Sequence, residues 1–195
     1  MAPSAIISQH APLSAAQESI NISKSALKES PHPDYLHHLA TSILHNLQYQ
    51  HSWTSLTIHT HSSMDSAPLP RPMISGLPPR RAYIHPDEQA AIIKAEHDRG
   101  EMIEQKPERE WVLPSHIKEK WTLNGFASVF RTISVVPPGD SGSNEEDEED
   151  VEESPVGDQW QGENRQKRLL LATLDGDSTV TYYIMHGGIV KPRQN

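Results

Sequence analysis

The chain contains no cysteine, so neither disulfide bonds nor thiolate metal sites are available to it. Apolar residues make up only 35% of its 195 residues, and no apolar run approaches the ~20 residues that a membrane span requires. The first residues also lack the apolar core of a secretory signal and the arginines of a transit peptide. These absences favour an intracellular protein that packs only part of its length into a core.

The chain has fewer basic residues (17) than acidic ones (26), and many of the acidic residues lie in one segment. Residues 139–164 carry 11 of the 26 acidic residues and no Lys or Arg, so the rest of the chain holds 15 acidic and 17 basic residues. That remainder is nearly neutral and lacks a strong basic field for binding nucleic acid by itself. We expect an acidic, disordered insertion over 139–165 that keeps the chain soluble, rather than a nucleic-acid mimic or a ligand for basic proteins.

Apolar periodicity predicts two helices. Pro86-Asp87-Glu88 is typical of a helix start, and this helix is expected to run to about residue 98, with Gly100 just past its end. The other helix is expected over 34–50. Residues 1–32 show no clear period, so we expect a disordered tail there. The apolar stripe of the helix at 34–50 consists of Leu36, Leu39, Ala40, Ile43, Leu44 and Leu47.

Alternating and β-branched stretches predict the strands. Asn124-Gly125 is expected to turn into the longest of them, and Ser115 suits the cap of a short helix that ends near residue 120. Together with a closing hairpin, these elements predict one α/β (α+β) domain over 33–192, with a mixed β-sheet packed by two or three helices. The strands before the hairpin are expected at 53–60, within 72–84, at 111–113 and at 126–136.

The most informative stretch runs from Lys167 to Met185. Two apolar runs flank Asp175-Gly176-Asp177-Ser178, and Asp-Gly between such runs is a strong hairpin signal, because Gly tolerates the positive φ of a tight turn. Both faces of each run are largely apolar, so we expect the hairpin to be covered on both sides. The first helix is expected to cover one face and a partner protein the other. Ile189-Val190 is expected to add a last extended stub.

The residue order in this hairpin resembles the last hairpin of the tRNA-intron endonucleases. Within that family the chain is most similar to the smallest, structural subunit of the eukaryotic tRNA-splicing endonuclease. The resemblance covers 33–192 except the acidic insertion, and its pieces follow one another in the same order. They are Gln50-His51-Ser52-Trp53, Pro70-Arg71-Pro72, Tyr83-Ile84-His85, Lys167-Arg168-Leu169-Leu170-Leu171-Ala172, Asp175-Gly176-Asp177 and Tyr182-Tyr183.

The resemblance implies what a catalytic member would need. Such members use a Tyr as base on a ribose 2′-hydroxyl, a His as acid on the leaving oxygen and a Lys that steadies the phosphate, without metal. Lys167 or Arg168 stands at the Lys position, but residues 122–166 contain neither Tyr nor His. We therefore expect no catalytic residues, and we interpret the two basic residues as the solvated start of a strand. The alternative is an active RNase that uses an atypical pair, Tyr83 and His116.

The resemblance also implies an assembly. Dimers in the family form through the last strands of two domains, and the partner here would be the catalytic subunit that cuts the 3′ splice site. An acidic loop then docks into a basic groove of a second dimer, which gives a heterotetramer that binds precursor tRNA in the nucleus or at the cytosolic face of mitochondria. Whether the isolated chain pairs with a second copy to form a homodimer stays open. The expected partner-interface residues are Tyr182, Tyr183, Ile184 and Met185 on the strand, and Asp175 and Asp177 on the loop.

Simpler interpretations of these features stay open. Asp-Gly is ordinary hairpin chemistry, so the two loop carboxylates need not dock anywhere. The whole chain would also suit an unrelated adaptor domain whose hairpin binds proteins. The twelve histidines include no His-Glu-x-x-His, so we expect solvent-facing side chains and neither a metal nor a cofactor. The histidines considered were His37, His38, His45, His51, His59 and His61.

Overall fold

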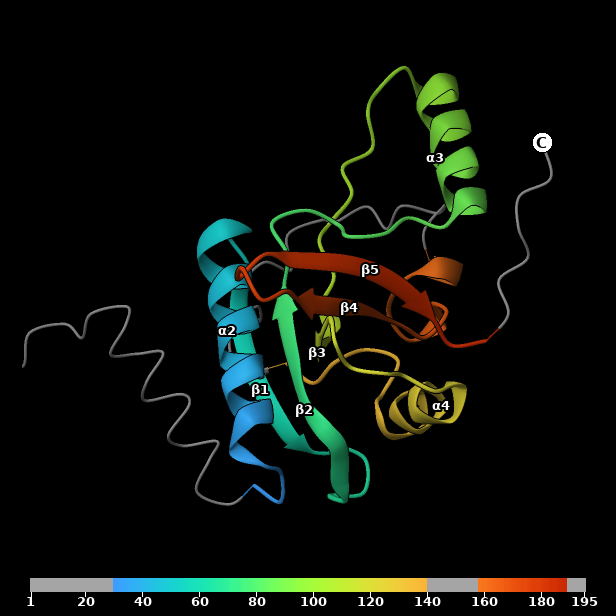
Figure 1. Cartoon of the computed structure of the whole chain (residues 1–195). Coiled ribbons are helices and arrows are strands. Elements are labelled where there is room, and N and C mark those ends of the chain that lie inside the picture. Colours follow the sequence, from blue (N-terminus) through green and yellow to red (C-terminus); the bar gives the residue numbers. More distant parts are fainter. Residues whose placement is uncertain (1–29, 140–157, 189–195) are drawn as a thin grey trace, which may run out of the picture.

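The computed structural model describes residues 30–139 and 158–188, which form a five-stranded sheet and three α-helices (Figure 1). The strand order is β1-β2-β3-β4-β5, and all neighbours are antiparallel except β3 and β4. The expected mixed sheet is therefore confirmed. The strands are β1 (Thr54–His61), β2 (Pro68–Leu77), β3 (Glu110–His116), β4 (Arg168–Leu174) and β5 (Val180–His186).

Helix α2 (Asp34–Gln50) spans the range that its apolar stripe predicts. The stripe packs on one face of the sheet, where Ile74 of β2, Val112 of β3 and Ala172 of β4 complete a buried cluster. Alternate residues of the same strands point to the opposite face and build a second cluster. The sheet thus has a core on both faces, and both faces of β4 are covered as expected.

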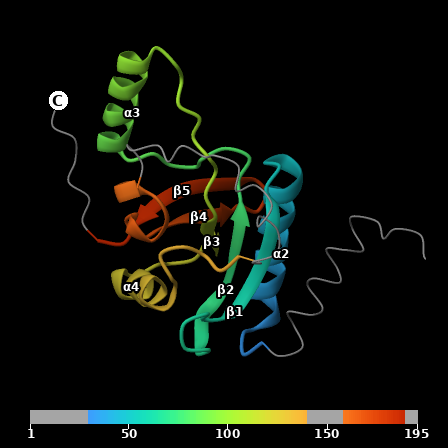
Figure 2. The same ribbon diagram turned by 180° about the vertical axis from the view of Figure 1, so that it is seen from behind.

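Helix α4 (Leu123–Thr132) replaces the strand expected at 126–136, so that prediction is wrong. The side chain of Thr122 accepts a hydrogen bond from the Gly125 N–H and caps the helix. Phe126, Val129 and Ile133 then recur at helical spacing and cover the second cluster, on the face opposite α2 (Figures 1 and 2). The crossover that a parallel pair such as β3 and β4 requires is carried by this helix.

Helix α3 (Pro86–Arg99) confirms the second predicted helix and stands away from both layers (Figures 1 and 2). His85 accepts from the Asp87 N–H while Glu88 reaches back to the His85 N–H, which forms a capping box. Gly100 ends the helix with φ 74°, in the left-handed region that favours glycine. The expected position of this glycine is confirmed.

One predicted helix is absent from the structure, and one predicted strand begins earlier than expected. The short helix expected from Ser115 is absent, because β3 continues to His116 and a turn follows, in which the Glu119 N–H donates to the His116 carbonyl. Strand β2 begins at Pro68 rather than near 72. Proline is tolerated there because β2 pairs with β3 only across 74–76, so its earlier residues have a ladder partner on one side alone.

The last part of the expected acidic insertion packs on the domain. Residues 158–164 form two 3-10 helices, Asp158–Trp160 and Gly162–Asn164, and Arg165 is buried. The prediction that the disordered insertion extends to residue 165 is therefore wrong for residues 158–165. The remainder of that segment, 140–157, lies outside the described residues, as do the expected tail over 1–29 and the stub at 189–190.

Candidate functional site

The predicted closing hairpin is confirmed, with β4 and β5 paired from Arg168↔His186 to Leu174↔Val180. The Asp175 N–H donates to the Thr179 carbonyl at 2.9 Å and closes the loop. Ser178, not Gly176, takes the left-handed conformation there, with φ 70°. The Asp-Gly signal thus predicts the hairpin correctly, although the positive φ that the turn requires is taken by Ser178.

Strand β5 forms one edge of the sheet, and no described strand pairs with its outer side. The hydrogen bonds from Asp175 N to Thr179 O and from Gly187 N to Lys167 O bracket the β4–β5 ladder. Because ladder bonds alternate along an antiparallel strand, the odd-numbered residues of β5 face β4 with their N–H and C=O groups. The backbone groups of Val180, Tyr182, Ile184 and His186 therefore point outward, available to another strand.

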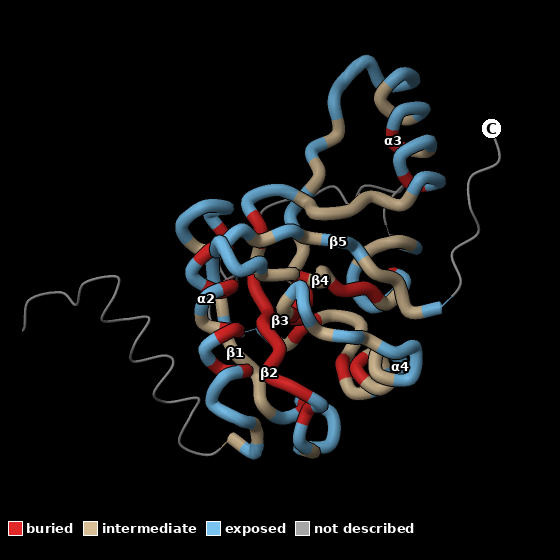
Figure 3. Tube along the Cα trace, in the orientation of Figure 1, coloured by how far each residue is buried: buried red, intermediate tan, exposed pale blue. Residues whose placement is uncertain are grey.

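Both faces of β5 carry covered and exposed side chains, which differ in their position along the strand. Tyr182 packs against the α2 cluster and Met185 against the α4 cluster. Tyr183 and Ile184 between them are 56% and 39% exposed. The expectation that one whole face goes to the first helix and the other to a partner is wrong, because each sheet face offers one covered and one exposed side chain. Figure 3 shows the contrast between this edge and the buried β3.

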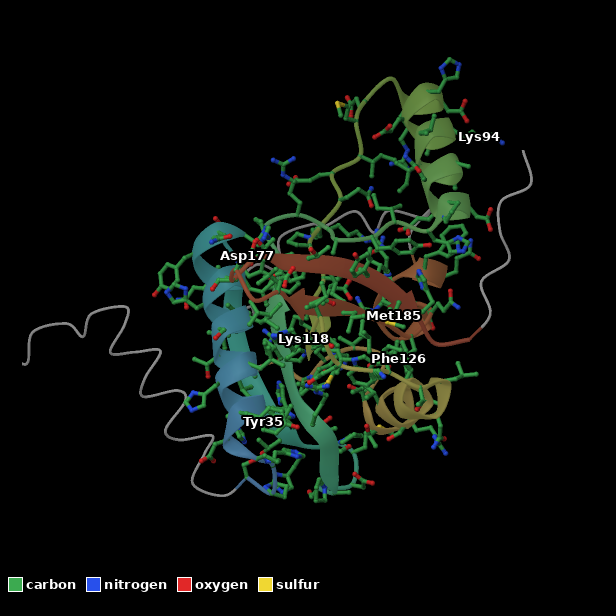
Figure 4. The ribbon with its side chains drawn as sticks, in the orientation of Figure 1. Tyr35, Lys94, Lys118, Phe126, Asp177 and Met185 are labelled. Carbon is green, nitrogen blue, oxygen red and sulfur yellow. The ribbon has the colours of Figure 1, made fainter. Side chains whose placement is uncertain are left out.

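The tip of the hairpin presents two exposed carboxylates. Asp175 accepts a hydrogen bond from the Gly176 N–H, and Asp177 accepts one from the Thr179 N–H at 2.9 Å. The bond from Thr179 lowers the pKa of Asp177, so this side chain is ionised at neutral pH. Figure 4 shows Asp177 beside the end of α2, at the far end of the hairpin from Met185. The tip is thus a negatively charged loop braced by its own backbone.

The two basic residues at the position of the family's catalytic Lys have structural partners. The ammonium of Lys167 donates to the carbonyls of Phe130 and Ile133 at 3.1 and 2.8 Å, at the C-terminal end of α4. The guanidinium of Arg168 is buried against Glu110. The interpretation of Lys167 and Arg168 as a solvated strand start is therefore wrong. Neither charge is free to steady a phosphate.

The alternative catalytic pair is not assembled. Tyr83 lies against Arg168, 5.3 Å from guanidinium carbon to ring centroid, and Arg168 pairs with Glu110 at the start of β3. His116 is the last residue of β3, and a strand of seven residues separates its ends by roughly 20 Å. Since β3 is the core strand before the hairpin, the stretch in which a Tyr and a His are needed begins at 117, and residues 117–166 contain neither.

A buried ionic network, which no sequence pattern indicated, lies beside Arg168. Arg81 donates to Glu88 at 2.6 Å, and Arg165 and Arg168 both contact Glu108 and Glu110. Burial raises the pKa of Glu108, but the Gly162 N–H and three guanidiniums outweigh it and lower the pKa overall. Burial raises the pKa of Glu110 despite the Arg168 hydrogen bonds. Apart from Arg81 and Glu88, which are 7 residues apart, the partners are distant in the chain, so the fold brings them together.

Four of the six histidines, His38, His45, His51 and His61, are exposed as expected, whereas His37 is buried and His59 is half-buried. His37 is 2% exposed and shares a 2.6 Å hydrogen bond with Ser30, so the expectation of a solvent-facing side chain is wrong at this residue. His59 contacts Trp111 edge to face and shares a 2.8 Å hydrogen bond with Ser75. Among the described residues, no three His, Asp or Glu side chains gather into a group that could hold a metal ion. No described helix is both long and apolar enough to cross a membrane.

Over 30–139 and 158–188, the fold and its edge define a class of protein: a small α/β domain with an open pairing strand and no assembled acid–base set. The Sen15 protein family model matches residues 42–146 and 152–195. A relative in Neurospora crassa, the probable tRNA-splicing endonuclease subunit tsp-1, is 48% identical over 161 residues, which are 83% of this chain and 67% of the relative. The chain belongs to the Sen15 family, the non-catalytic structural subunits of tRNA-splicing endonuclease. The expected family and the expected lack of a catalytic role are confirmed.

Proposed function

We propose that this subunit binds the catalytic subunit of the endonuclease by adding the outer edge of β5 to the partner's last strand. The unpaired backbone groups of β5 at the end of the sheet carry this proposal. Main-chain hydrogen bonds supply affinity in such strand addition, and alternate side chains supply specificity. The subunit would then complete and orient the partner rather than cut RNA.

Tyr183 and Ile184 are the side chains best placed to contact the partner. They are the exposed apolar residues of β5, and aromatic anchors contribute strongly to interfaces. Tyr182 and Met185 hold the strand against the two cores, so their part in the interface is to support it. Without a partner, the same edge would pair with a second copy and give a homodimer.

The tip of the hairpin is proposed to join two dimers into a heterotetramer. The carboxylates of Asp175 and Asp177 are exposed and held by turn hydrogen bonds, which suits insertion into a basic groove. The assembled complex would bind precursor tRNA, in the nucleus or at the cytosolic face of mitochondria. The domain over 33–192 would be sufficient for assembly, without the tail over 1–32.

A proline substitution tests the strand addition directly. Ile184→Pro removes an outward N–H but no bond to β4, and proline is tolerated on an edge strand. We expect the variant to fold and to lose co-purification with the catalytic subunit. Ile184→Ala keeps the N–H and should retain weaker binding, which separates the backbone contribution from that of the side chain.

The matched control lies on the other edge of the sheet. Thr57→Ala on β1 removes an exposed side chain of similar size and should leave binding unchanged. Circular dichroism would verify that each variant is folded. Normal recovery of the catalytic subunit with folded Ile184→Pro would show that β5 is not the pairing strand.

A further inference from the structure

A pocket of about 280 Å³ opens at the C-terminal end of β5, between the segment that precedes α3 and the 3-10 turns at 158–164. Its size lies near the lower end of ligand pockets and suits a group of one or two rings. Ring side chains form much of its wall, and they come from three separate parts of the chain. These are Tyr83, His85, Trp160 and His186.

Two of the lining rings are stacked on one another. Those of His85 and Trp160 are nearly parallel, at 13°, with centroids 6.4 Å apart. A planar group can stack on one of them directly, and a shift of about 1 Å would let it touch both, since stacked carbons lie 3.5–4.0 Å apart. Tyr83 meets His186 at 64° and 4.8 Å, so these two rings contact each other edge to face.

The charges beneath the pocket cancel. Arg165 and Arg168 line it, but Glu108 and Glu110 neutralise them within the buried network. Burial, then Arg168 and His85, lower the pKa of His186, so its ring is neutral at pH 7. A free anion would find no unpaired buried cation here. A neutral planar group with hydrogen-bonding edges fits better, because Gln159 and Gln166 supply amides at the pocket wall.

We propose that this pocket binds a single unpaired nucleobase. Proteins recognise single-stranded RNA by stacking bases on aromatic or imidazole rings and by bonding their edges with polar side chains. The pocket offers both at the size of one base. The proposal concerns direct contact with RNA and does not depend on pairing through β5, because the residues that line the pocket all belong to this chain.

Nuclear magnetic resonance of the full chain tests the proposal. The indole N–H signal of Trp160 would be followed while the four nucleoside 5′-monophosphates are added, each to roughly 10 mM because one stacked base gives weak binding. Nucleotides should shift this signal, whereas ribose 5-phosphate should not. A second arm adds an unstructured RNA tetranucleotide, whose tighter binding would identify RNA rather than free nucleotide as the source of the base.

Two variants remove the stacking surfaces while keeping the local fold. Trp160→Ala leaves the backbone carbonyl that Arg81 contacts, and His85→Asn retains a side chain able to cap α3. Each should weaken nucleotide binding by roughly fivefold or more, read for Trp160→Ala from backbone amide shifts. Tyr35→Ala, an exposed residue of another groove, should change nothing. Equal shifts with ribose 5-phosphate, no shift with any nucleotide, or unchanged binding by both variants would overturn the proposal.

Discussion

The hydroxyl of Tyr182 on β5 donates a 2.7 Å hydrogen bond to Oδ1 of Asn46 on α2. His51 contacts the same ring edge to face, with centroids 5.1 Å apart. Asn46 is 8% exposed, so its oxygen has little access to water. This bond joins the edge strand to the helix that covers the sheet, and it holds the strand in place while its outer side stays open.

Removal of that hydroxyl should cost stability. Tyr182→Phe leaves the Asn46 oxygen buried without a donor, and such a loss typically lowers the free energy of unfolding by about 1–2 kcal/mol. Tyr183→Phe is the matched control, because that ring is 56% exposed, and it should change the value by less than about 0.5 kcal/mol. Urea unfolding measures both. Equal values for the two variants would show that the Asn46 bond contributes nothing.

How far sequence predicts this fold depends on the competing signals at each element. The stripe of α2 has one period and no competitor, and its range is reproduced to the residue. At 126–136 two periods compete, because Ala127, Val129 and Ile133 suit a strand while Phe126, Val129 and Ile133 suit a helix. The cap at Thr122 favours the helix, which is the element that forms. The β-branched residues of the stretch favour a strand, so the sequence alone predicts the wrong element.

The site also has features that the sequence predicts and features that it does not. The hairpin and its apolar composition were readable because they depend on neighbours in the chain. The exposure of Tyr183 and Ile184 cannot be predicted in this way, because it depends on where α2 and α4 end over the sheet. The pocket beside Trp160 was missed for a related reason. Its rings come from distant segments, one of them adjacent to an acidic run that composition alone marks as unpacked.

The buried network makes Glu110 essential for stability. Its side chain is 1% exposed and contacts both Arg165 and Arg168. Glu110→Gln would leave two buried guanidiniums short of a counter-charge, which typically costs about 3–5 kcal/mol. Glu101→Gln, on an exposed residue, should stay within about 0.5 kcal/mol of the parent. Thermal unfolding distinguishes them, and an unchanged midpoint for Glu110→Gln would contradict this role.

Stability should fall in mild acid, partly through His59. Burial, then the nearby charge of Arg109, lower its pKa to about 4. Between pH 6.5 and that value the unfolded chain binds the proton and the folded chain does not, so stability is lost as the pH falls. His59→Gln removes this titration. Over that range its free energy of unfolding should decrease by about 3 kcal/mol less than that of the parent, and parallel curves would exclude the effect.

The acidic segment offers a test of where the domain boundary lies. Replacing residues 140–157 by a short Gly/Ser linker should change stability by at most ~1 kcal/mol, because loop length has a small entropic cost. Extending the deletion through Arg165 should destabilise the domain strongly, since Arg165 belongs to the buried network. Calorimetry of the two variants separates these outcomes. Loss of the transition in the shorter deletion would show that the segment packs on the domain.

Charge reversal at the hairpin tip should separate the two levels of assembly. Asp175→Lys with Asp177→Lys places cations where a basic groove is proposed to bind, while the β5 edge remains intact. We expect pairing with the catalytic subunit to persist and the heterotetramer to dissociate into dimers, as measured by native mass spectrometry. Asp175→Asn with Asp177→Asn is the control, because Asn keeps an oxygen for the Gly176 and Thr179 N–H groups but removes the charge. It should weaken the tetramer less than the Lys pair. An intact tetramer with both Lys substitutions would show that the tip is only a turn.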